Sequence, residues 1–498
     1  MLLVWRRKNS VIHFWEKFEK SVYFIPIKQY NILANLCQEA FVMELNYQNI
    51  LNTKKHFHFI GIGGSGMFPL VQILHQKGCY ITGSDNNLTD TVEYERNVLG
   101  IKVTIGHDPA NLEGADCVIY TAAIPKDNPE LLAAHASGAL VIERAKMLGL
   151  ISQGYTNAIC VSGTHGKTTT SAMITQILLG AGLDPSVVIG GKLPILHGSG
   201  RVGKSDLMVC EACEFTDHFL ELSPDISIIL NVDADHLEYF GTIENIIKSF
   251  RKFAQKTSRT LIVNGDDANT MKAVEHLEGK EIVTFGSNDS CDYYPVDISY
   301  HPDATTTFTL MHHGNKVADL TLNVPGQHNI LNAVSACAAC LIAGASPDEI
   351  AKNLADFRGA GRRFEVLGKK NGITIADDYA HHPTELEATL KATKEMPFGE
   401  VWAVFQPFTY SRTKILFDDF VRVLPIADHV VLSPIMGGRE SDTLGICSED
   451  LAEKIPGAVV LPDFETIAAY TLSHAKPGDL IITMGCGDVN KCSKMMIK

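Results

Sequence analysis

The sequence predicts an α/β protein built from three domains with mostly parallel sheets. Short apolar runs alternate with helical patterns along most of the chain, as they do in doubly wound sheets. Glycine turns or polar clusters follow many of these runs, which is where open parallel sheets carry their ligands. A length of 498 residues agrees with about three domains of roughly 150 residues each. We place these domains at 54–150, 151–360 and 361–498.

The second domain begins with a phosphate-binding loop. An apolar run at 158–161 is followed by a turn between Gly163 and Gly166, and Lys167-Thr168 then starts a helical pattern. This order of strand, glycine turn, Lys-Thr and helix is typical of a P-loop in its short form, G-T-H-G-K-T. Backbone N–H groups and the helix dipole would hold phosphate oxygens. Lys167 would contact the β- and γ-phosphates, and Thr168 would join the coordination of Mg²⁺.

Another glycine turn begins the first domain. The strand at 57–62 runs into a G-x-G-x-x-G spacing that ends at Gly66, and Asp85 follows the next strand. In dinucleotide-binding folds such glycines hold a diphosphate and such an acid holds the ribose. The spacing is a weak signal that suits any nucleotide diphosphate. It leaves an NAD-dependent oxidoreductase open as an alternative.

Polar side chains also follow two further strands of the second domain. Glu211 follows the apolar run 207–210, and Asp235 and His236 follow the run 226–230. Carboxylates at strand ends beside a phosphate loop are suited to bind Mg²⁺. We therefore interpret Glu211 and His236 as candidate metal ligands, whereas Asp235 would equally suit a helix cap.

Two stretches near the end of the second domain offer further nucleotide contacts. After a strand-rich segment, His328, Asn329 and Asn332 stand at the start of a helical pattern, where they would bind a purine edge or cap the helix. A glycine-bearing joint then carries Arg362 and Arg363. Either arginine could stabilise a transferring phosphoryl group, with the joint letting the third domain swing. A solvated charge cluster is the other interpretation.

The third domain repeats the pattern of apolar strands that end in polar clusters. The strand at 373–376 ends in Asp377-Asp378 and leads to His381-His382, and the strand at 480–484 ends in a glycine turn. These are positions at which parallel sheets bind ligands. Adjacent histidines with only aspartates nearby do not by themselves predict a metal site.

Composition and charge argue against several classes of function. The formal net charge of −14 disfavours a nucleic-acid-binding surface. The 12 cysteines are scattered along the chain, which disfavours zinc and a disulfide framework and favours a reducing, cytoplasmic compartment. No run of about 18 uncharged apolar residues occurs, so we expect no membrane insertion.

The first residues differ in composition from the rest. The region before Met43 holds Trp5 and Trp15, and no small-residue cleavage site follows an apolar core, which disfavours a secretory signal. An amphipathic appendage is one interpretation, and a translation start placed too early, with Met43 as the true start, is the other. We assign 1–53 to an N-terminal extension that stands apart from the three domains.

Motifs spread over about residues 54–498 resemble those of the Mur ligase family. They are HFIGIGGSGM, GTHGKTTT, EACE, DADH, GQHNILNA, GRRFE, DDYAHHPTE, FQP with YSRT, and MGCGD. Several motifs in the family's order are far more specific than any one of them. The resemblance implies an N-terminal Rossmann-like UDP-binding domain, a central P-loop ATPase with a mostly parallel sheet, and a C-terminal Rossmann-like domain.

The implied activity is an ATP-dependent, amide-forming ligation in peptidoglycan precursor synthesis. The lactyl carboxylate of UDP-N-acetylmuramate would attack the γ-phosphate of ATP, and the amino group of L-alanine would displace phosphate from the acyl phosphate. Mg²⁺ is the implied cofactor, and the implied state is a cytoplasmic monomer or homodimer. The RRFE and HHPTE stretches favour L-alanine over the tripeptide that a related muropeptide ligase attaches. A nucleotide sensor that binds without acyl transfer is a third alternative.

The resemblance also implies a set of site residues. Those for ATP are Gly163, Thr164, His165, Gly166, Lys167, Thr168, Thr169, His328, Asn329, Asn332, Arg362 and Asp378. Those for the UDP-sugar are Gly63, Gly64, Ser65, Gly66, Asp85, His107, Thr121, Ala122 and Ile124. Tyr379, His381 and Arg412 would line the amino-acid pocket. Thr168, Glu211 and His236 would bind metal, and Lys167, His236, Arg363 and His381 would act in catalysis.

The sequence departs from the family pattern at two places. Phe408 and Thr409 follow the FQP motif, where many relatives have a histidine and some also an arginine, so the amino-acid pocket would be lined differently. EACEF stands where many relatives have EADES, which leaves the role of Glu214 open.

Overall fold

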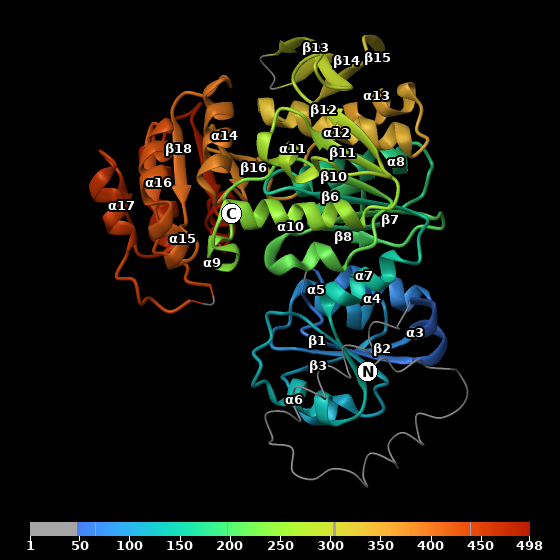
Figure 1. Cartoon of the computed structure of the whole chain (residues 1–498). Coiled ribbons are helices and arrows are strands. Elements are labelled where there is room, and N and C mark those ends of the chain that lie inside the picture. The colour runs from blue at the N-terminus through green and yellow to red at the C-terminus, as the bar shows by residue number, and fades with distance from the viewer. Residues whose placement is uncertain (1–46, 65, 197, 302–304, 439) are drawn as a thin grey trace, which may run out of the picture. The chain divides into compact units, whose positions relative to one another are not determined.

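The computed structural model describes residues 47–64, 66–196, 198–301, 305–438 and 440–498. The chain divides into two units, residues 1–53 and residues 54–498. Of the N-terminal extension, only helix α3 (Tyr47–Thr53) is among the described residues. The second unit holds three sheets, which Figure 1 shows in blue, in green to yellow, and in orange to red. The predicted α/β class is confirmed.

The first sheet has five parallel strands in the order β3-β2-β1-β4-β5. The strands are β1 (His56–Ile60), β2 (Tyr80–Asp85), β3 (Lys102–Ile105), β4 (Cys117–Tyr120) and β5 (Leu140–Glu143). The helices are α4 (Phe68–Gln76), α5 (Asp90–Asn97), η1 (Pro109–Leu112), α6 (Pro129–Ala136) and α7 (Arg144–Ser152). The strand order reverses between β1 and β4, which in such sheets opens a ligand crevice at the carboxyl ends of the strands.

The second sheet has ten strands in the order β15-β14-β13-β12-β11-β10-β6-β9-β7-β8. The strands are β6 (Asn157–Ser162), β7 (Ser186–Leu193), β8 (Gly198–Arg201), β9 (Leu207–Glu211), β10 (Ile226–Ile229), β11 (Thr260–Asn264), β12 (Glu281–Phe285), β13 (Tyr293–Tyr300), β14 (Thr306–His312) and β15 (Asn315–Leu322). The central strands β10, β6 and β9 are parallel neighbours. Their residues are mostly apolar and buried because both faces of the sheet are covered.

The helices of the second domain are α8 (Lys167–Gly180), η2 (Pro194–Leu196), η3 (Phe215–Glu221), α9 (Leu237–Phe240), α10 (Ile243–Lys256), α11 (Ala268–Val274), α12 (Gln327–Ile342) and α13 (Pro347–Ala355). Residues of α8, α12 and α13 share a continuous apolar core with the sheet. The segment that was predicted to be rich in strands contains β11 to β15, but it also contains α11. Helix α12 begins at Gln327, so the predicted purine-binding residues lie within its first turns.

The third sheet has six strands in the order β16-β17-β21-β18-β19-β20, with apolar clusters on both faces. The strands are β16 (Glu365–Lys370), β17 (Ile373–Asp378), β18 (Val401–Phe405), β19 (His429–Leu432), β20 (Val459–Val460) and β21 (Leu480–Met484). The helices are α14 (Pro383–Lys394), α15 (Tyr410–Ile415), α16 (Phe417–Val423), η4 (Leu424–Ile426), α17 (Ser448–Lys454), α18 (Phe464–His474) and α19 (Asn490–Ile497).

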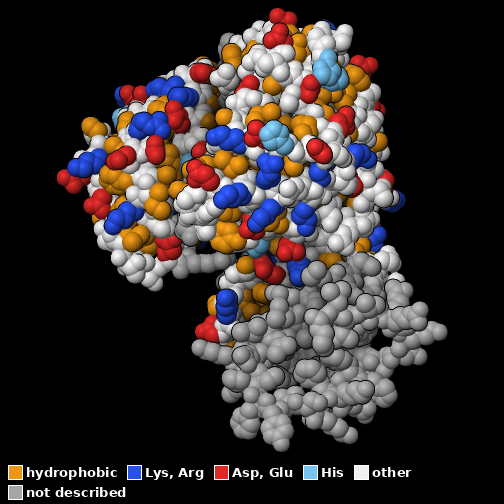
Figure 2. Space-filling model, in the orientation of Figure 1, with side chains coloured by type: hydrophobic (Ala, Val, Ile, Leu, Met, Phe, Trp, Pro, Cys, Tyr) orange, Lys and Arg blue, Asp and Glu red, His pale blue; other side chains and the backbone are white. Residues whose placement is uncertain are grey.

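The surface of the described residues carries charges of both signs. On the face seen in Figure 2, Lys and Arg side chains are interspersed with Asp and Glu side chains over the coloured part of the molecule. Among the described residues, no helix combines the length and the apolar character that crossing a membrane requires.

Candidate active site

The predicted phosphate loop joins β6 to α8 at the carboxyl edge of the second sheet. Gly163 has φ +135° and Gly166 has φ +87°, a backbone region that favours glycine. A Cβ at Gly166 would also lie 2.6 Å from Oδ1 of Asn332. The loop is fixed from β10, because Asn231 accepts from the backbone N–H of His165 at 2.8 Å. The predicted order of strand, turn and helix is confirmed.

Lys167 is held by groups of its own domain. Its Nζ donates to the carbonyl oxygens of Gly163 at 2.6 Å and of Thr164 at 2.9 Å, and it lies 2.8 Å from the Glu214 carboxylate. Burial opposes the charge, but the Glu214 carboxylate outweighs it and raises the pKa of Lys167. Glu214, whose role the sequence left open, is therefore the counter-ion of the loop lysine.

Thr168 and Glu211 form an oxygen-rich pair next to this lysine. The Thr168 hydroxyl donates to the Glu211 carboxylate at 2.9 Å, and the same carboxylate accepts from the backbone of Gly190 at 2.7 Å. Arg363 donates to the Thr168 hydroxyl at 3.4 Å. The structure therefore brings two of the three predicted metal ligands together, on the ends of α8 and β9.

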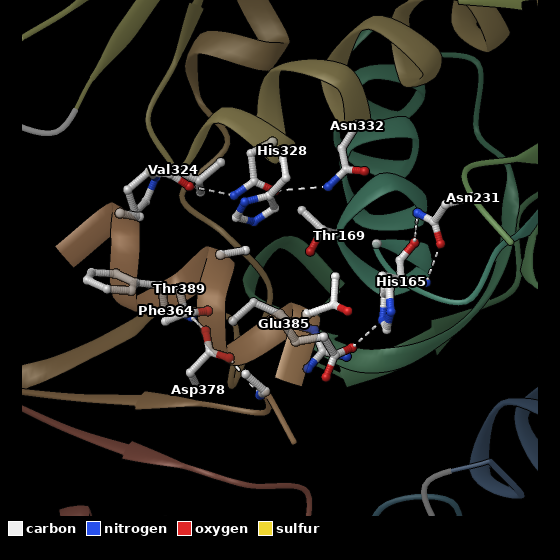
Figure 3. Close-up of a pocket in the computed structure, with 18 of the residues that line it drawn as sticks. His165, Thr169, Asn231, Val324, His328, Asn332, Phe364, Asp378, Glu385 and Thr389 are labelled. Carbon is white, nitrogen blue, oxygen red and sulfur yellow. Dashed lines mark hydrogen bonds and ion pairs between the residues drawn. The ribbon is translucent and has the colours of Figure 1, made fainter. Parts of the chain in front are cut away.

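A cavity of about 400 Å³ lies between the loop and the third domain. Figure 3 shows Thr169, His328 and Asn332 on one side of it and Phe364, Asp378 and Thr389 on the other. A volume in this range is usual for small-molecule sites. The wall is completed by both domains, so the cavity depends on how they meet.

Two groups in the cavity wall have shifted pKa values. Desolvation by the surrounding protein lowers the pKa of His328 to about 4, which keeps its imidazole neutral. Burial raises the pKa of Asp378 to about 6, although Phe364 and Ala380 donate their backbone N–H groups to its carboxylate, each at 2.7 Å. Asn332 donates to Asn329 at 3.0 Å, which orients the two amides.

Arg362 and Arg363 donate hydrogen bonds to different parts of the molecule. Arg362, whose φ is +59°, donates to Asp377 at 2.8 Å and to the carbonyl oxygens of Gly485 and Gly487. Arg363 lines the cavity and contacts Thr168. The structure thus brings Arg363 to the predicted site, whereas Arg362 is engaged within the third domain.

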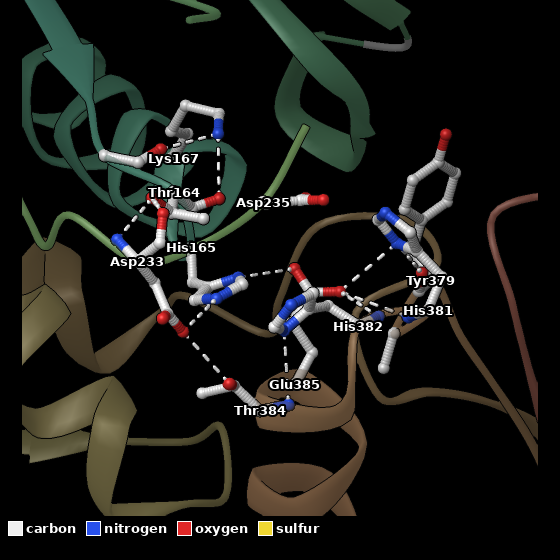
Figure 4. Close-up of polar contacts among 12 residues, drawn as sticks. Thr164, His165, Lys167, Asp233, Asp235, Tyr379, His381, His382, Thr384 and Glu385 are labelled. Carbon is white, nitrogen blue, oxygen red and sulfur yellow. Dashed lines mark hydrogen bonds and ion pairs between the residues drawn. The ribbon is translucent and has the colours of Figure 1, made fainter. Parts of the chain in front are cut away.

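His165 connects the phosphate loop with the third domain (Figure 4). Its Nδ1 lies 3.2 Å from Glu385 on α14, and its Nε2 lies 3.3 Å from Asp233 after β10. The Thr384 hydroxyl donates to Asp233 at 3.1 Å. Burial opposes protonation, but the two carboxylates raise the pKa of His165 to about 9.

This cluster was not predicted from the sequence, because Asp233 and Glu385 belong to different domains. Only the capping pattern of HHPTE was a local signal, since His382 caps α14 and Glu385 returns to its N-terminus. Nitrogen and oxygen atoms of His165, Asp233 and His382 lie within 4.8 Å of one another. Both ring nitrogens of His165 already face carboxylates in this arrangement.

The residues predicted for the amino-acid pocket lie around α15 and the end of β17. Arg412 and Asp235 form a buried ion pair at 3.0 Å, which joins the third domain to the second. His381 lies 3.2 Å from Glu385, and its ring meets the edge of Tyr379. Asp235 does not cap α9; His236 precedes that helix, with no side-chain cap.

Three further residues near this pocket are His236, Thr409 and Phe408. The ring of His236 packs against Phe215, with the centroids 4.7 Å apart. Thr409 caps α15 by accepting from the backbone of Arg412 at 3.4 Å, so it supports the helix that carries that arginine. Phe408 pairs its backbone with Met436.

The residues predicted for the UDP-sugar gather at the carboxyl edge of the first sheet. Asp85 accepts from the backbone of Gly63 at 3.0 Å, and the carbonyl oxygen of Asp85 accepts from Gly106 at 2.8 Å. Thr121 approaches the glycine turn, because a Cβ at Gly61 would lie 3.0 Å from its methyl group. Ser65 lies outside the described residues.

Comparison with family models identifies the class of protein. The Mur ligase family model described as its catalytic domain matches residues 56–156, the Mur ligase middle domain matches 161–340, and the Mur ligase glutamate ligase domain matches 362–487. The chain belongs to the Mur ligase family.

Individual relatives carry a more specific name. The chain is 43% identical to the UDP-N-acetylmuramate–L-alanine ligase of Acetivibrio thermocellus, over 90% of this chain and 96% of the relative. It is 44% identical to the ligase of the same name from Agathobacter rectalis, over 89% of this chain and 98% of the relative.

Solved structures of related ligases are also similar to this chain. The UDP-N-acetylmuramate–alanine ligase of Thermotoga maritima is 27% identical with a TM-score of 0.75, over 89% of this chain and 98% of that chain. A murein peptide ligase of Psychrobacter arcticus is 26% identical with a TM-score of 0.68, over the same shares.

The two arginines give a matched pair of variants. Arg362→Ala should lower the free energy of unfolding by about 3 kcal/mol, because it removes the cationic partner of the buried Asp377. Arg363→Ala should leave stability nearly unchanged, because its contacts lie at the cavity. Urea unfolding of both variants would measure this, and equal stability losses would contradict the assignment.

The His165 contact predicts a pH-dependent stability. Its pKa rises from 6.5 to about 9 on folding, so its stabilisation is complete below pH 6.5 and is lost as pH rises through 9. Glu385→Gln should lower stability by about 1.5 kcal/mol at pH 7 and much less at pH 10. Glu387→Gln is the control, because Glu387 lies on the same helix but contacts Lys391 and Arg422 instead of His165. A loss that is equal at both pH values would refute the contact.

Proposed function

We propose that the chain joins L-alanine to the lactyl carboxylate of UDP-N-acetylmuramate, with ATP converted to ADP and phosphate. The main support is the 43% identity to a UDP-N-acetylmuramate–L-alanine ligase over 96% of that relative. The site supports it too, because residues of the phosphate loop and Arg363 line one cavity, and an oxygen-rich pair lies beside that loop. The product, UDP-N-acetylmuramoyl-L-alanine, is a peptidoglycan precursor. The proposed setting is the cytoplasm, as a monomer or homodimer.

ATP would occupy the cavity between the two domains. His328, Asn329 and Asn332 would surround the adenine, and the buried Asp378 would face the ribose. The loop N–H groups of Gly163 to Thr169 would receive the phosphates, as helix N-termini do. Lys167 would exchange its contact with Glu214 for phosphate oxygens. Arg362 belongs to the predicted set, but its contacts favour a structural role.

The donor set beside the loop suits Mg²⁺. The Thr168 hydroxyl and the Glu211 carboxylate are hard oxygen ligands 2.9 Å apart, and His236 is the predicted further ligand. When bound there, the ion would neutralise phosphate charge. The chain's own contribution is to hold the Glu211 carboxylate in place through Thr168 and Gly190.

The reaction needs an acyl phosphate because a carboxylate is a poor electrophile. The lactyl oxygen would attack the γ-phosphorus and displace ADP, which turns the carboxyl oxygen into part of a leaving group. The amine of L-alanine would then add to the carbonyl carbon and lose a proton, and phosphate would depart as the carbonyl re-forms. Arg363 and Lys167 are placed to neutralise charge on the transferring phosphoryl group, and Tyr379, His381 and Arg412 would surround the amino acid.

The first test is turnover by the purified protein. Phosphate release with Mg-ATP should require both UDP-N-acetylmuramate and L-alanine. Replacing L-alanine with the tripeptide distinguishes the murein peptide ligase reaction, whereas the relatives that are 43% and 44% identical to this chain are named for L-alanine. ATP binding without release under any combination would indicate a nucleotide sensor instead.

Removal of the loop lysine should abolish turnover. Lys167→Met keeps the length of the side chain but removes the charge from the phosphates, so kcat should fall by about a thousandfold. Lys252→Met, at an exposed position on α10, is the control. Activity near the normal level in Lys167→Met would contradict the assignment of the loop.

A further inference from the structure

A buried carboxylate organises the edge of the first sheet at which the sugar nucleotide is proposed to bind. Glu130, in the first turn of α6, is fully buried. Its Oε1 lies 2.8 Å from Nε2 of His58, and its Oε2 lies 3.0 Å from Nδ1 of His107. Ser84, at the end of β2, donates to Oε2 at 2.7 Å. The carboxylate thus joins β1, β2 and the loop after β3.

The protons in this network can be placed. Burial opposes the charge of Glu130, but its hydrogen bonds lower its pKa, so the carboxylate is ionised and only accepts. Nδ1 of His107 must therefore carry a proton. A neutral imidazole protonated at Nδ1 has a lone pair on Nε2. Among the described residues, that nitrogen has no hydrogen-bond partner, and 8% of the His107 side chain remains exposed.

The position of His107 corresponds to the base end of a bound nucleotide. In related sheets the diphosphate lies at the first glycine turn and the acid after the second strand holds the ribose. Here that turn follows β1, Asp85 ends β2, and His107 follows β3, the next strand outward. A nucleotide that runs across these three strand ends would place its base beside His107.

We infer that Glu130 is a positioning residue that makes His107 a reader of uracil. Nε2 of His107 accepts a hydrogen bond from N3–H of the base. Uracil has a hydrogen on N3, whereas cytosine has a lone pair there, which would face the lone pair of Nε2. The site thereby selects uridine over cytidine nucleotides. This inference rests on the proposed binding of UDP-N-acetylmuramate at this edge.

Equilibrium binding of UDP and CDP to the full chain tests the inference without ATP or L-alanine. Calorimetry should show UDP bound at least about tenfold more tightly than CDP by the unmodified protein. Glu130→Ala should lose about tenfold in UDP affinity and little in CDP affinity, so the preference should collapse.

His58→Ala is the matched control. It removes the partner of the other Glu130 oxygen and disturbs the same buried network, but it leaves the contact between Glu130 and His107. It should keep the preference for UDP even though it loses stability. A preference that survives in Glu130→Ala would overturn the inference, as would its collapse in His58→Ala.

His107→Ala keeps the inference testable if Glu130→Ala does not fold. It should lose the same preference, and normal selection of UDP in this variant would overturn the inference. If the protein turns over UDP-N-acetylmuramate but the variants keep the preference for UDP, the role of Glu130 is refuted and the proposed substrate is not. A failure of the unmodified protein to bind UDP would refute both this role and the proposed substrate.

Discussion

The parallel register of β10, β6 and β9 is the constraint on which the candidate site depends. Because these neighbours run in the same direction, their carboxyl ends deliver Asn231, the glycine loop and Glu211 to one edge of the sheet. No single element holds the site. Asn231 fixes the loop from one side, and Glu211 approaches Thr168 from the other. The catalytic chemistry is thereby assembled from short segments that the sheet aligns.

Charge compensation within the site explains why so many ionised groups can be buried together. Lys167 is paired with Glu214, Arg412 with Asp235, and His165 with two carboxylates. Removing one member of such a pair leaves a buried charge unmatched, which is costly. A triphosphate brings several negative charges, so the lysine and arginine at the loop must change partners when it enters.

The features that could be predicted from the sequence are those that depend on residues close together along the chain. The phosphate loop, the strand ends and the order of domains carry local signals, and the confirmed loop between β6 and α8 is the clearest of them. Contacts between distant segments carry no such signal. His165 meets Glu385 across 220 residues, and Arg412 meets Asp235 across 177. The sequence also could not show which of Arg362 and Arg363 reaches the cavity, because this depends on the positive φ of Arg362.

Residues of two domains form the walls of the cavity, so the affinity for any ligand in it depends on how these domains meet. Only molecules whose domains are closed possess the complete cavity, so the apparent dissociation constant equals the intrinsic one divided by the closed fraction. A substitution at the joint near Gly359 would change that fraction. It would alter nucleotide affinity without touching the nucleotide. Selection on affinity can therefore act on residues of the joint as well as on residues of the wall.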